Sequence, residues 1–129
     1  MQVKIYYHHT DCGGVVYYAN YLKFLEEART EFFAERGISI KDLAREGTLF
    51  VVARQEIDYK LPAVYGDILD IDAQIGTSSP VRLEFIHEIR NQHNLLVSQA
   101  KTTLVCVDAN LKPKAIPESI RPKLIRDTP

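Results

Sequence analysis

The sequence from Tyr6 to Gly37 reads Y-Y-H-H-T-D-C-G-G-V-V-Y-Y-A-N-Y-L-K-F-L-E-E-A-R-T-E-F-F-A-E-R-G. The carboxylate of Asp11 comes shortly before two adjacent glycines, and a long amphipathic pattern follows them. Its apolar positions recur at helical spacing and are Tyr21, Phe24, Leu25, Ala28 and Phe32. This order predicts a carboxylate beside a helix N-terminus, where unpaired backbone N–H groups and the positive end of the helix dipole face outward.

Capping signals predict where the helices begin and end. Gly37 is a suitable C-terminal stop for the long helix. Its start has two candidates, with Asn20 as the N-cap or with a first turn that begins earlier, at residues 16–18. A short second helix is expected over residues 39–46, capped by its own first residue and ended by Gly47.

The other segments alternate between apolar and polar residues, which predicts strands. The expected strands are residues 2–8, 49–59, 69–75, 81–90 and 95–107. In the second of these, Val51 and Ala53 are expected on the same face as Ile57 and Tyr59. The turns between the later strands are signalled at residues 61–67, 77–80 and 91–94. One further helical turn is expected after Pro117, with Ile120, Leu124 and Ile125 packing down.

This order of elements favours an α+β fold. Four consecutive strands with short turns predict an antiparallel sheet, and the apolar stripe of the long helix is too narrow for a helical bundle. Wrapping the sheet around the helix buries both. The last strand is apolar on both faces near Leu104 and Val105, which suits a central strand or an edge covered by a second subunit.

Length and charge exclude several classes of protein. The 129 residues predict a single domain, residues 1–129, and the net charge of -1 without a basic stripe argues against a nucleic-acid partner. No apolar run approaches the ~20 residues that cross a bilayer. The first residues lack a signal-peptide pattern, so a cytoplasmic protein with Cys12 and Cys106 reduced is expected.

The motif Thr10-Asp11-x-x-Gly14-x-Val16, within its flanks from Tyr7 to Tyr21, resembles the signature of the 4-hydroxybenzoyl-CoA thioesterase-like hotdog proteins. The likeness covers nearly the whole chain, and it is strongest toward the short acyl-CoA thioesterases associated with the bacterial Tol-Pal envelope system. It implies a hotdog fold, in which a curved antiparallel sheet wraps around one long helix. It also implies a homodimer or homotetramer with active sites at subunit interfaces.

The resemblance further implies roles for single residues. Asp11 matches the catalytic carboxylate, and Gly14 matches the glycine that lets the chain turn beside it. Tyr18 matches the position whose backbone N–H polarises the thioester carbonyl. The Tol-Pal-associated branch often has His at that position, so the resemblance supports the backbone role of Tyr18 and not a side-chain role. Tyr7 matches a tyrosine close to the carboxylate, and a role as a core strand aromatic is the alternative.

Thioester chemistry needs few groups, because the acyl carbon is activated and the thiolate leaves readily. Asp11 would either attack the carbonyl and form a mixed anhydride or deprotonate a water molecule. A simple loop-capping role for Asp11 is the alternative. The function expected is hydrolysis of acyl-CoA to free acid and CoA. The second hypothesis is a non-catalytic module that binds acyl-CoA or an acyl-carrier protein. A dehydratase is disfavoured, because Tyr17 and Tyr18 stand where those relatives carry histidine.

Four residues are candidates for substrate binding. Phe50 and Val52 would line the acyl pocket from the neighbouring subunit, and Ser79 and Arg82 would lie near the CoA nucleotide. An ordinary core or surface role is the alternative for each of them.

The histidines suggest neither a cofactor nor a metal. His8 and His9 stand where relatives are frequently acidic, and their spacing from Asp11 and Cys12 fits no common zinc pattern. On a strand, at most one of the two would face the pocket. His87, on an apolar strand face, is interpreted as a core histidine.

Overall fold

One antiparallel sheet carries the fold in the computed structural model, which describes residues 1–125 of the expected 1–129 domain. The elements are β1 (Gln2–Lys4), the 3₁₀ helix η1 (Tyr7–His9), α1 (Tyr18–Glu35), α2 (Ile40–Arg45), β2 (Leu49–Tyr59), β3 (Ile68–Ser78), β4 (Arg82–Arg90), β5 (Leu96–Val107) and α3 (Arg121–Leu124). The strand order is β1-β3-β4-β5-β2. The expected antiparallel sheet is therefore confirmed, with β5 inside it and β2 at an edge.

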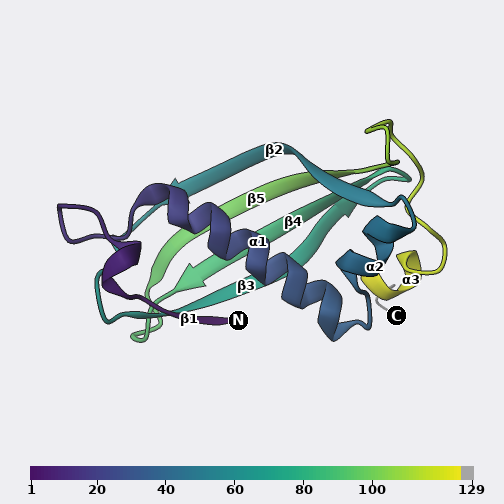
Figure 1. Cartoon of the computed structure of the whole chain (residues 1–129). Coiled ribbons are helices and arrows are strands. Elements are labelled where there is room, and N and C mark those ends of the chain that lie inside the picture. The colour runs from purple at the N-terminus through teal and green to yellow at the C-terminus, as the bar shows by residue number, and fades with distance from the viewer. Residues whose placement is uncertain (126–129) are drawn as a thin grey trace.

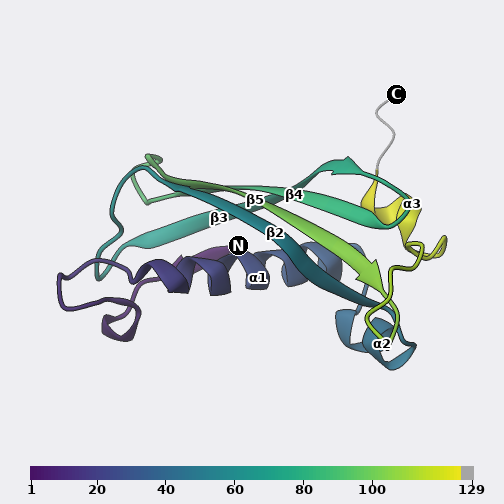
Figure 2. The same ribbon diagram turned by 90° about the horizontal axis from the view of Figure 1, so that it is seen from above.

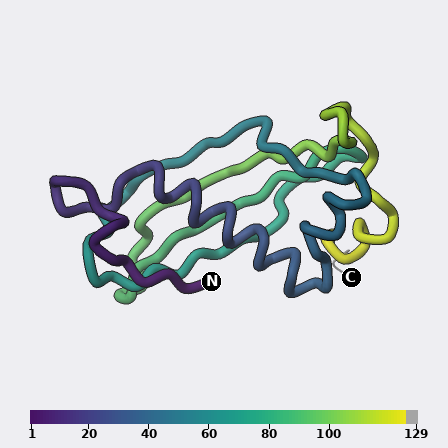
Figure 3. Tube along the Cα trace, in the orientation of Figure 1, coloured from purple at the N-terminus to yellow at the C-terminus, as the bar shows by residue number. Residues whose placement is uncertain are grey.

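The sheet curves around α1, which lies along its concave face (Figures 1 and 2). The two short helices α2 and α3 gather near the C-terminal end of α1. The Cα trace shows the loop between η1 and α1 projecting beyond the other end of the helix (Figure 3). The predicted α+β arrangement of one long helix and a wrapping sheet is confirmed.

The apolar stripe of α1 builds the core as expected. The buried residues of the helix are Tyr21, Phe24, Leu25, Ala28, Arg29, Phe32 and Phe33. Near its C-terminal end, Phe32 and Phe33 meet Phe85 of β4 at ring-centroid distances of 5.1 and 5.7 Å. Each apolar side chain buried in this way contributes about 1.5–3 kcal/mol relative to exposure. The sheet and the helix thus bury their apolar faces against each other.

The helix ends follow the capping signals. The long helix begins at Tyr18, so the earlier of the two expected starts is correct. Gly37 takes a φ of +72°, a left-handed conformation that favours glycine after a helix. Ser39 caps α2 by accepting a hydrogen bond from the Asp42 N–H at 3.1 Å. In the tail, Ile120 and Leu124 are buried around α3.

The expected N-terminal strand over residues 2–8 is wrong beyond Lys4. Ile5 still bonds to the Asp67 carbonyl at 2.9 Å, but the chain then turns into η1. Tyr7 carries the alternation that suggested a longer strand, yet its side chain is 74% exposed. The alternation of apolar and polar residues misled the prediction, because a tyrosine fits this alternation equally well in a strand and in a surface turn.

The expected face of β2 is also wrong at its N-terminal half. The register shifts between Val52 and Arg54, so Ala53 is left out of the ladder as a bulge. Phe50 and Val52 pair with Cys106 and Leu104, whose side chains are buried. Phe50 and Val52, and not their neighbours, therefore share the inner face with the C-terminal half of the strand.

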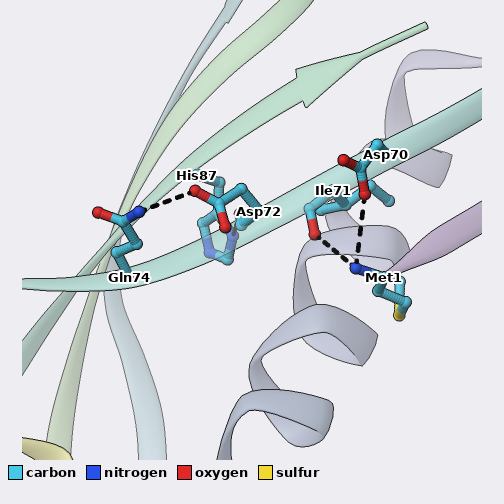
Figure 4. Close-up of polar contacts among 6 residues, drawn as sticks. All are labelled: Met1, Asp70, Ile71, Asp72, Gln74 and His87. Atoms are coloured by element: carbon cyan, nitrogen blue, oxygen red, sulfur yellow. Dashed lines mark hydrogen bonds and ion pairs between the residues drawn. The ribbon is translucent and has the colours of Figure 1, made fainter. Parts of the chain in front are cut away.

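The short strand β1 is anchored by the chain's own amino group. The Met1 nitrogen donates to the Ile71 carbonyl at 3.0 Å and lies 3.7 Å from the Asp70 carboxylate (Figure 4). None of the helices within residues 1–125 combines the length and the apolar character that a membrane crossing requires. Both cysteines are free, Cys12 at the surface and Cys106 in the core.

His87 is a fully buried histidine of β4, as expected. Its strand neighbours are Ala73 and Ala100, whose small side chains leave room for the ring. Its Nδ1 lies 3.1 Å from the Asp72 carbonyl, which can only accept, so we assign the proton to Nδ1. Nε2 has no hydrogen-bond partner among the described residues. Burial, with a smaller contribution from the Arg29 charge, lowers the His87 pKa to about 4.

We expect this histidine to make the fold sensitive to acid. The unfolded chain takes up the proton at the ordinary pKa of 6.5, whereas the folded state resists it down to about 4. Stability is therefore present above pH 6.5 and lost as the pH falls through this window, by up to about 3 kcal/mol. Urea unfolding across the window measures the loss. His87→Leu should lose less stability on acidification than the wild type, and His93→Leu in the exposed loop should behave as wild type. Identical pH dependence in both variants would contradict this assignment.

Candidate functional site

Asp11 begins a tight, solvent-exposed loop. Its Oδ1 accepts the Gly13 N–H at 2.7 Å, its N–H donates to the Val15 carbonyl at 2.9 Å, and its carbonyl accepts the Gly14 N–H at 3.1 Å. Thr10 and Val16 close the loop as an isolated bridge. Asp11 thus has a loop-capping role through Oδ1, while Oδ2 has no hydrogen-bond partner in the described part of the chain.

Gly14 makes this loop possible. Its φ is +81°, in the left-handed region that costs other residues energy. A side chain at Gly13 would instead meet the Asp11 carboxylate, at 3.1 Å from Oδ1. The two glycines therefore have different roles, one in the backbone turn and one in leaving space for the carboxylate.

The first turn of α1 follows directly after the loop. Tyr18 is the first helical residue, and a helix leaves the N–H groups of its first turn without intrahelical partners. No acceptor for the Tyr18 N–H is found in residues 1–125. The Tyr18 side chain is exposed, and its carbonyl accepts a 3.4 Å hydrogen bond from the Tyr59 hydroxyl. This helix end is free to donate to a negatively charged oxygen.

The electrostatics connect Asp11 with the helix start. The pKa of Tyr17 is raised, first by the hydrogen bond with the Tyr18 side chain and, among smaller causes, by the negative charge of Asp11. Such a contribution requires the carboxylate to lie within electrostatic range of the residue before α1.

The chain's seven tyrosines gather at this end of the molecule. Tyr7 is not a core strand aromatic, because its exposed ring stacks on Tyr65 at 4.1 Å. Tyr21 is buried and meets Tyr59 edge-on at 5.3 Å. Sequence reasoning missed Tyr59 and Tyr65. The only signal in the sequence was that both are tyrosines, like several residues around Asp11. Only the fold brings them beside the Asp11 loop.

His8 and His9 do not lie on a strand, so the expectation that they point to opposite faces is wrong. In η1 their rings are 4.0 Å apart. His9 is the more buried of the two, and its carbonyl contacts the start of α1. Within the described residues, His, Cys, Asp and Glu nowhere form a group of three or more that is suited to a metal ion.

The four candidate substrate-binding residues lie away from Asp11 within one subunit. Phe50 stacks on Phe33, near the C-terminal end of α1, at 5.6 Å. The Ser79 carbonyl accepts a hydrogen bond from Arg121 of α3 at 3.0 Å, and Arg82 starts β4 beside it (Figure 1). The 18 residues of α1 span roughly 27 Å, and Phe50 packs near the C-terminal end of this helix whereas Asp11 precedes its N-terminal end.

Val52 lies on the exposed edge of the sheet, and its side chain is 52% exposed. Neither Asp11 nor Tyr18 lines any of four surface hollows formed by the described residues. A single subunit therefore does not bring the candidate catalytic residues, Asp11 and Tyr18, together with the four candidate substrate-binding residues.

Comparisons with known proteins agree with this architecture. The family model described as the thioesterase-like superfamily matches residues 6–124. The acyl-CoA thioester hydrolase YbgC of Escherichia coli O6:H1 is 40% identical over 119 residues, which cover 92% of this chain and 89% of that protein. The acyl-CoA thioesterase YbgC of Haemophilus influenzae is 35% identical over 121 residues, covering 92% and 88%.

A solved structure supports the fold independently. The crystal structure of a 1,4-dihydroxy-2-naphthoyl-CoA thioesterase from Synechocystis superposes with a TM-score of 0.89 at 24% identity, covering 96% of this chain and 93% of that one. At this identity the likeness concerns the fold. Together with the family match, it confirms the expected hotdog fold.

The left-handed turn beside Asp11 is testable by adding one methyl group. Gly14→Ala places a side chain at a φ of +81° and is expected to lower the free energy of unfolding by about 1–2 kcal/mol. Gly14→Asn is the matched control, because asparagine adopts the left-handed conformation more readily than alanine. Urea titration of both variants measures the difference. Equal stability of the two would show that the loop does not require the left-handed conformation.

Proposed function

This chain belongs to the thioesterase-like superfamily, and we propose that it hydrolyses acyl-CoA through Asp11 and the Tyr18 backbone N–H. It is a thioester hydrolase, as its relatives' names and its fold indicate. The observation that supports the assignment of residues is the loop closed by the Thr10–Val16 bridge, which contains Asp11 and leads into the unpaired start of α1. The proposed site contains no cofactor.

The Tyr18 N–H and the Asp11 carboxylate have different roles in the proposed reaction. The helix N-terminus stabilises the negative charge that develops on the carbonyl oxygen, with the Tyr18 N–H as the nearest donor. The free Oδ2 of Asp11 either attacks the acyl carbon or accepts a proton from the attacking water. The first route forms an anhydride and expels the CoA thiolate before water releases the acid. A burst of one thiol per site before steady turnover distinguishes it from the second.

The complete site is proposed to lie between two subunits. β2 bonds to β5 on one side only, so its other edge is open along 11 residues. If a second copy pairs with this edge antiparallel about a two-fold axis, the Phe50–Val52 end of one β2 lies beside the Tyr59 end of the other. Tyr59 contacts Tyr18, so the acyl-pocket candidates of one subunit would then meet the catalytic pair of its neighbour.

Ser79 and Arg82 are proposed to serve the CoA end of the substrate. The Ser79 hydroxyl accepts the Arg82 N–H at 3.1 Å and shapes the turn before β4. The exposed Arg82 guanidinium has no partner among residues 1–125, so it is available to a phosphate. An acyl group on an acyl-carrier protein presents the same pantetheine thioester and is the second proposed substrate.

Three further assignments belong to the proposal. The domain is proposed to span residues 1–129, and assembly into a homodimer, or a tetramer built from two of them, follows from the shared site. The Thr10–Val16 motif supports a place in the 4-hydroxybenzoyl-CoA thioesterase-like branch, nearest the Tol-Pal-associated enzymes. An acyl-CoA substrate and two free thiols suit the reducing cytoplasm.

Removal of the Asp11 charge tests the chemistry. Asp11→Asn keeps the side-chain oxygen that caps the loop and should fold normally, but it should lower thioester hydrolysis about a hundredfold or more. A panel of aliphatic and aromatic CoA esters with a thiol-trapping dye measures the rate. Asp42→Asn at the far end of the molecule is the control and should retain activity. Normal turnover by Asp11→Asn refutes the assignment, and flat traces for the wild type with measurable CoA binding favour a binding module.

A charge on the open edge tests the shared site. Val52→Lys should block pairing of β2 with a second copy, because lysine on an edge strand opposes strand addition. We expect a shift toward monomer in sedimentation velocity, together with a loss of hydrolysis. Leu95→Lys is the matched control, since Leu95 is 51% exposed against 52% for Val52. A Val52→Lys protein that stays dimeric and fully active would place the site elsewhere.

A further inference from the structure

His9 connects η1 to the start of α1 by four hydrogen bonds. Its N–H donates to the Tyr6 carbonyl at 3.0 Å, and its ring nitrogen Nδ1 accepts the Tyr6 N–H at 2.9 Å. Its carbonyl accepts both the Tyr17 N–H and the Asn20 side-chain amide, each at 2.8 Å. The residue therefore holds η1 on one side and the first turn of α1 on the other.

The ring of His9 is also fixed by packing. It meets Phe24, a core residue of α1, edge-on at a centroid distance of 5.4 Å. The reciprocal pair with Tyr6 has the form of a capping box, in which the third residue of a helix usually supplies Glu or Gln to accept the N-cap N–H. Here an imidazole takes that part, two residues before Asp11.

We propose that His9 is a positioning residue, which uses a neutral imidazole to fix the Asp11 carboxylate relative to the first turn of α1. The inference rests on the proposed function of Asp11 and Tyr18. His9 itself faces neither the carboxylate nor the helix N–H through its ring. It acts because the main chain on both sides of the loop is bonded to the same residue.

The geometry requires one protonation state. Nδ1 can accept the Tyr6 N–H only while it carries no proton, so the proton of the neutral ring is on Nε2. The groups facing the ring are Tyr6, which precedes η1, His8 from η1 and Lys23 from α1, together with the neutral Phe24. Partial burial, His8 and Lys23 lower the His9 pKa below 6.5, so the neutral form is kept at neutral pH. Protonation turns the acceptor into a donor that opposes the Tyr6 N–H.

Two substitutions of His9 distinguish the effect of its hydrogen-bond acceptor from the effect of its protonation. His9→Gln keeps an acceptor that does not titrate, whereas His9→Phe keeps the ring against Phe24 and removes the acceptor. At neutral pH, His9→Gln should retain near-normal hydrolysis. His9→Phe should lower kcat about tenfold or more with little change in KM, since small displacements of reacting groups are costly. His8→Gln is the matched control one residue away.

The pH profile separates positioning from mere structural support. Between about pH 5 and 8, wild type and His8→Gln should lose kcat on the acid side with a midpoint below 6.5, and His9→Gln should lack that limb. The limb persisting unchanged in His9→Gln would overturn the proposal. The Tyr6 amide resonance provides a readout without turnover. It should titrate with His9 in wild type and in Asp11→Asn, and not in His9→Gln.

These readouts also distinguish the two proposals. If Asp11→Asn stays active while the Tyr6 amide titrates through His9, the catalytic assignment fails and the contact with His9 stands. If Asp11→Asn is inactive but the Tyr6 amide does not respond to pH in the wild type, the role of His9 fails alone.

Discussion

The packing of one face of α1 into the concave side of the sheet is the constraint on which the structure depends. Every strand contributes to the curved surface, and the aromatic residues Phe32, Phe33 and Phe85 close it near the C-terminal end of the helix. Burial of this surface is the main stabilising term. It also fixes the direction of the helix, so its N-terminus is held at the edge of the core, where backbone N–H groups meet solvent.

The reactive groups occur where the core ends. The helix start cannot satisfy its own N–H groups, and the edge strand β2 cannot satisfy both of its sides. In the proposed assembly, a second subunit would cover β2, and a substrate oxygen would accept from the start of α1, so both deficits would be resolved at neighbouring places. The proposed site shared by two identical subunits would account for the separation of Phe50 and Asp11 within one chain.

In the loop between η1 and α1, Val16 is buried in the core, whereas the turn around Asp11 is exposed. The geometry of this turn comes from short hydrogen bonds, both within the main chain and between side chains and the main chain, of which those to His9 and within the Asp11 turn are central. The exposed tyrosines surround this loop without burying it. Precision at this end of the molecule thus comes from directional bonds, whereas the opposite end depends on aromatic packing.

The sequence alone determined the long helix and the antiparallel sheet, and its order puts Asp11 shortly before the helix start. Those features repeat with a regular period or sit in a specific motif, as at Thr10–Val16, so local residues encode them. Only the tertiary structure decided that the N-terminal strand stops at Lys4 and that Ala53 bulges out of β2. It also decided that His9 bonds across the loop and that Tyr65 meets Tyr7. These depend on contacts between distant residues, and a period of two or of 3.6 residues carries no information about such partners.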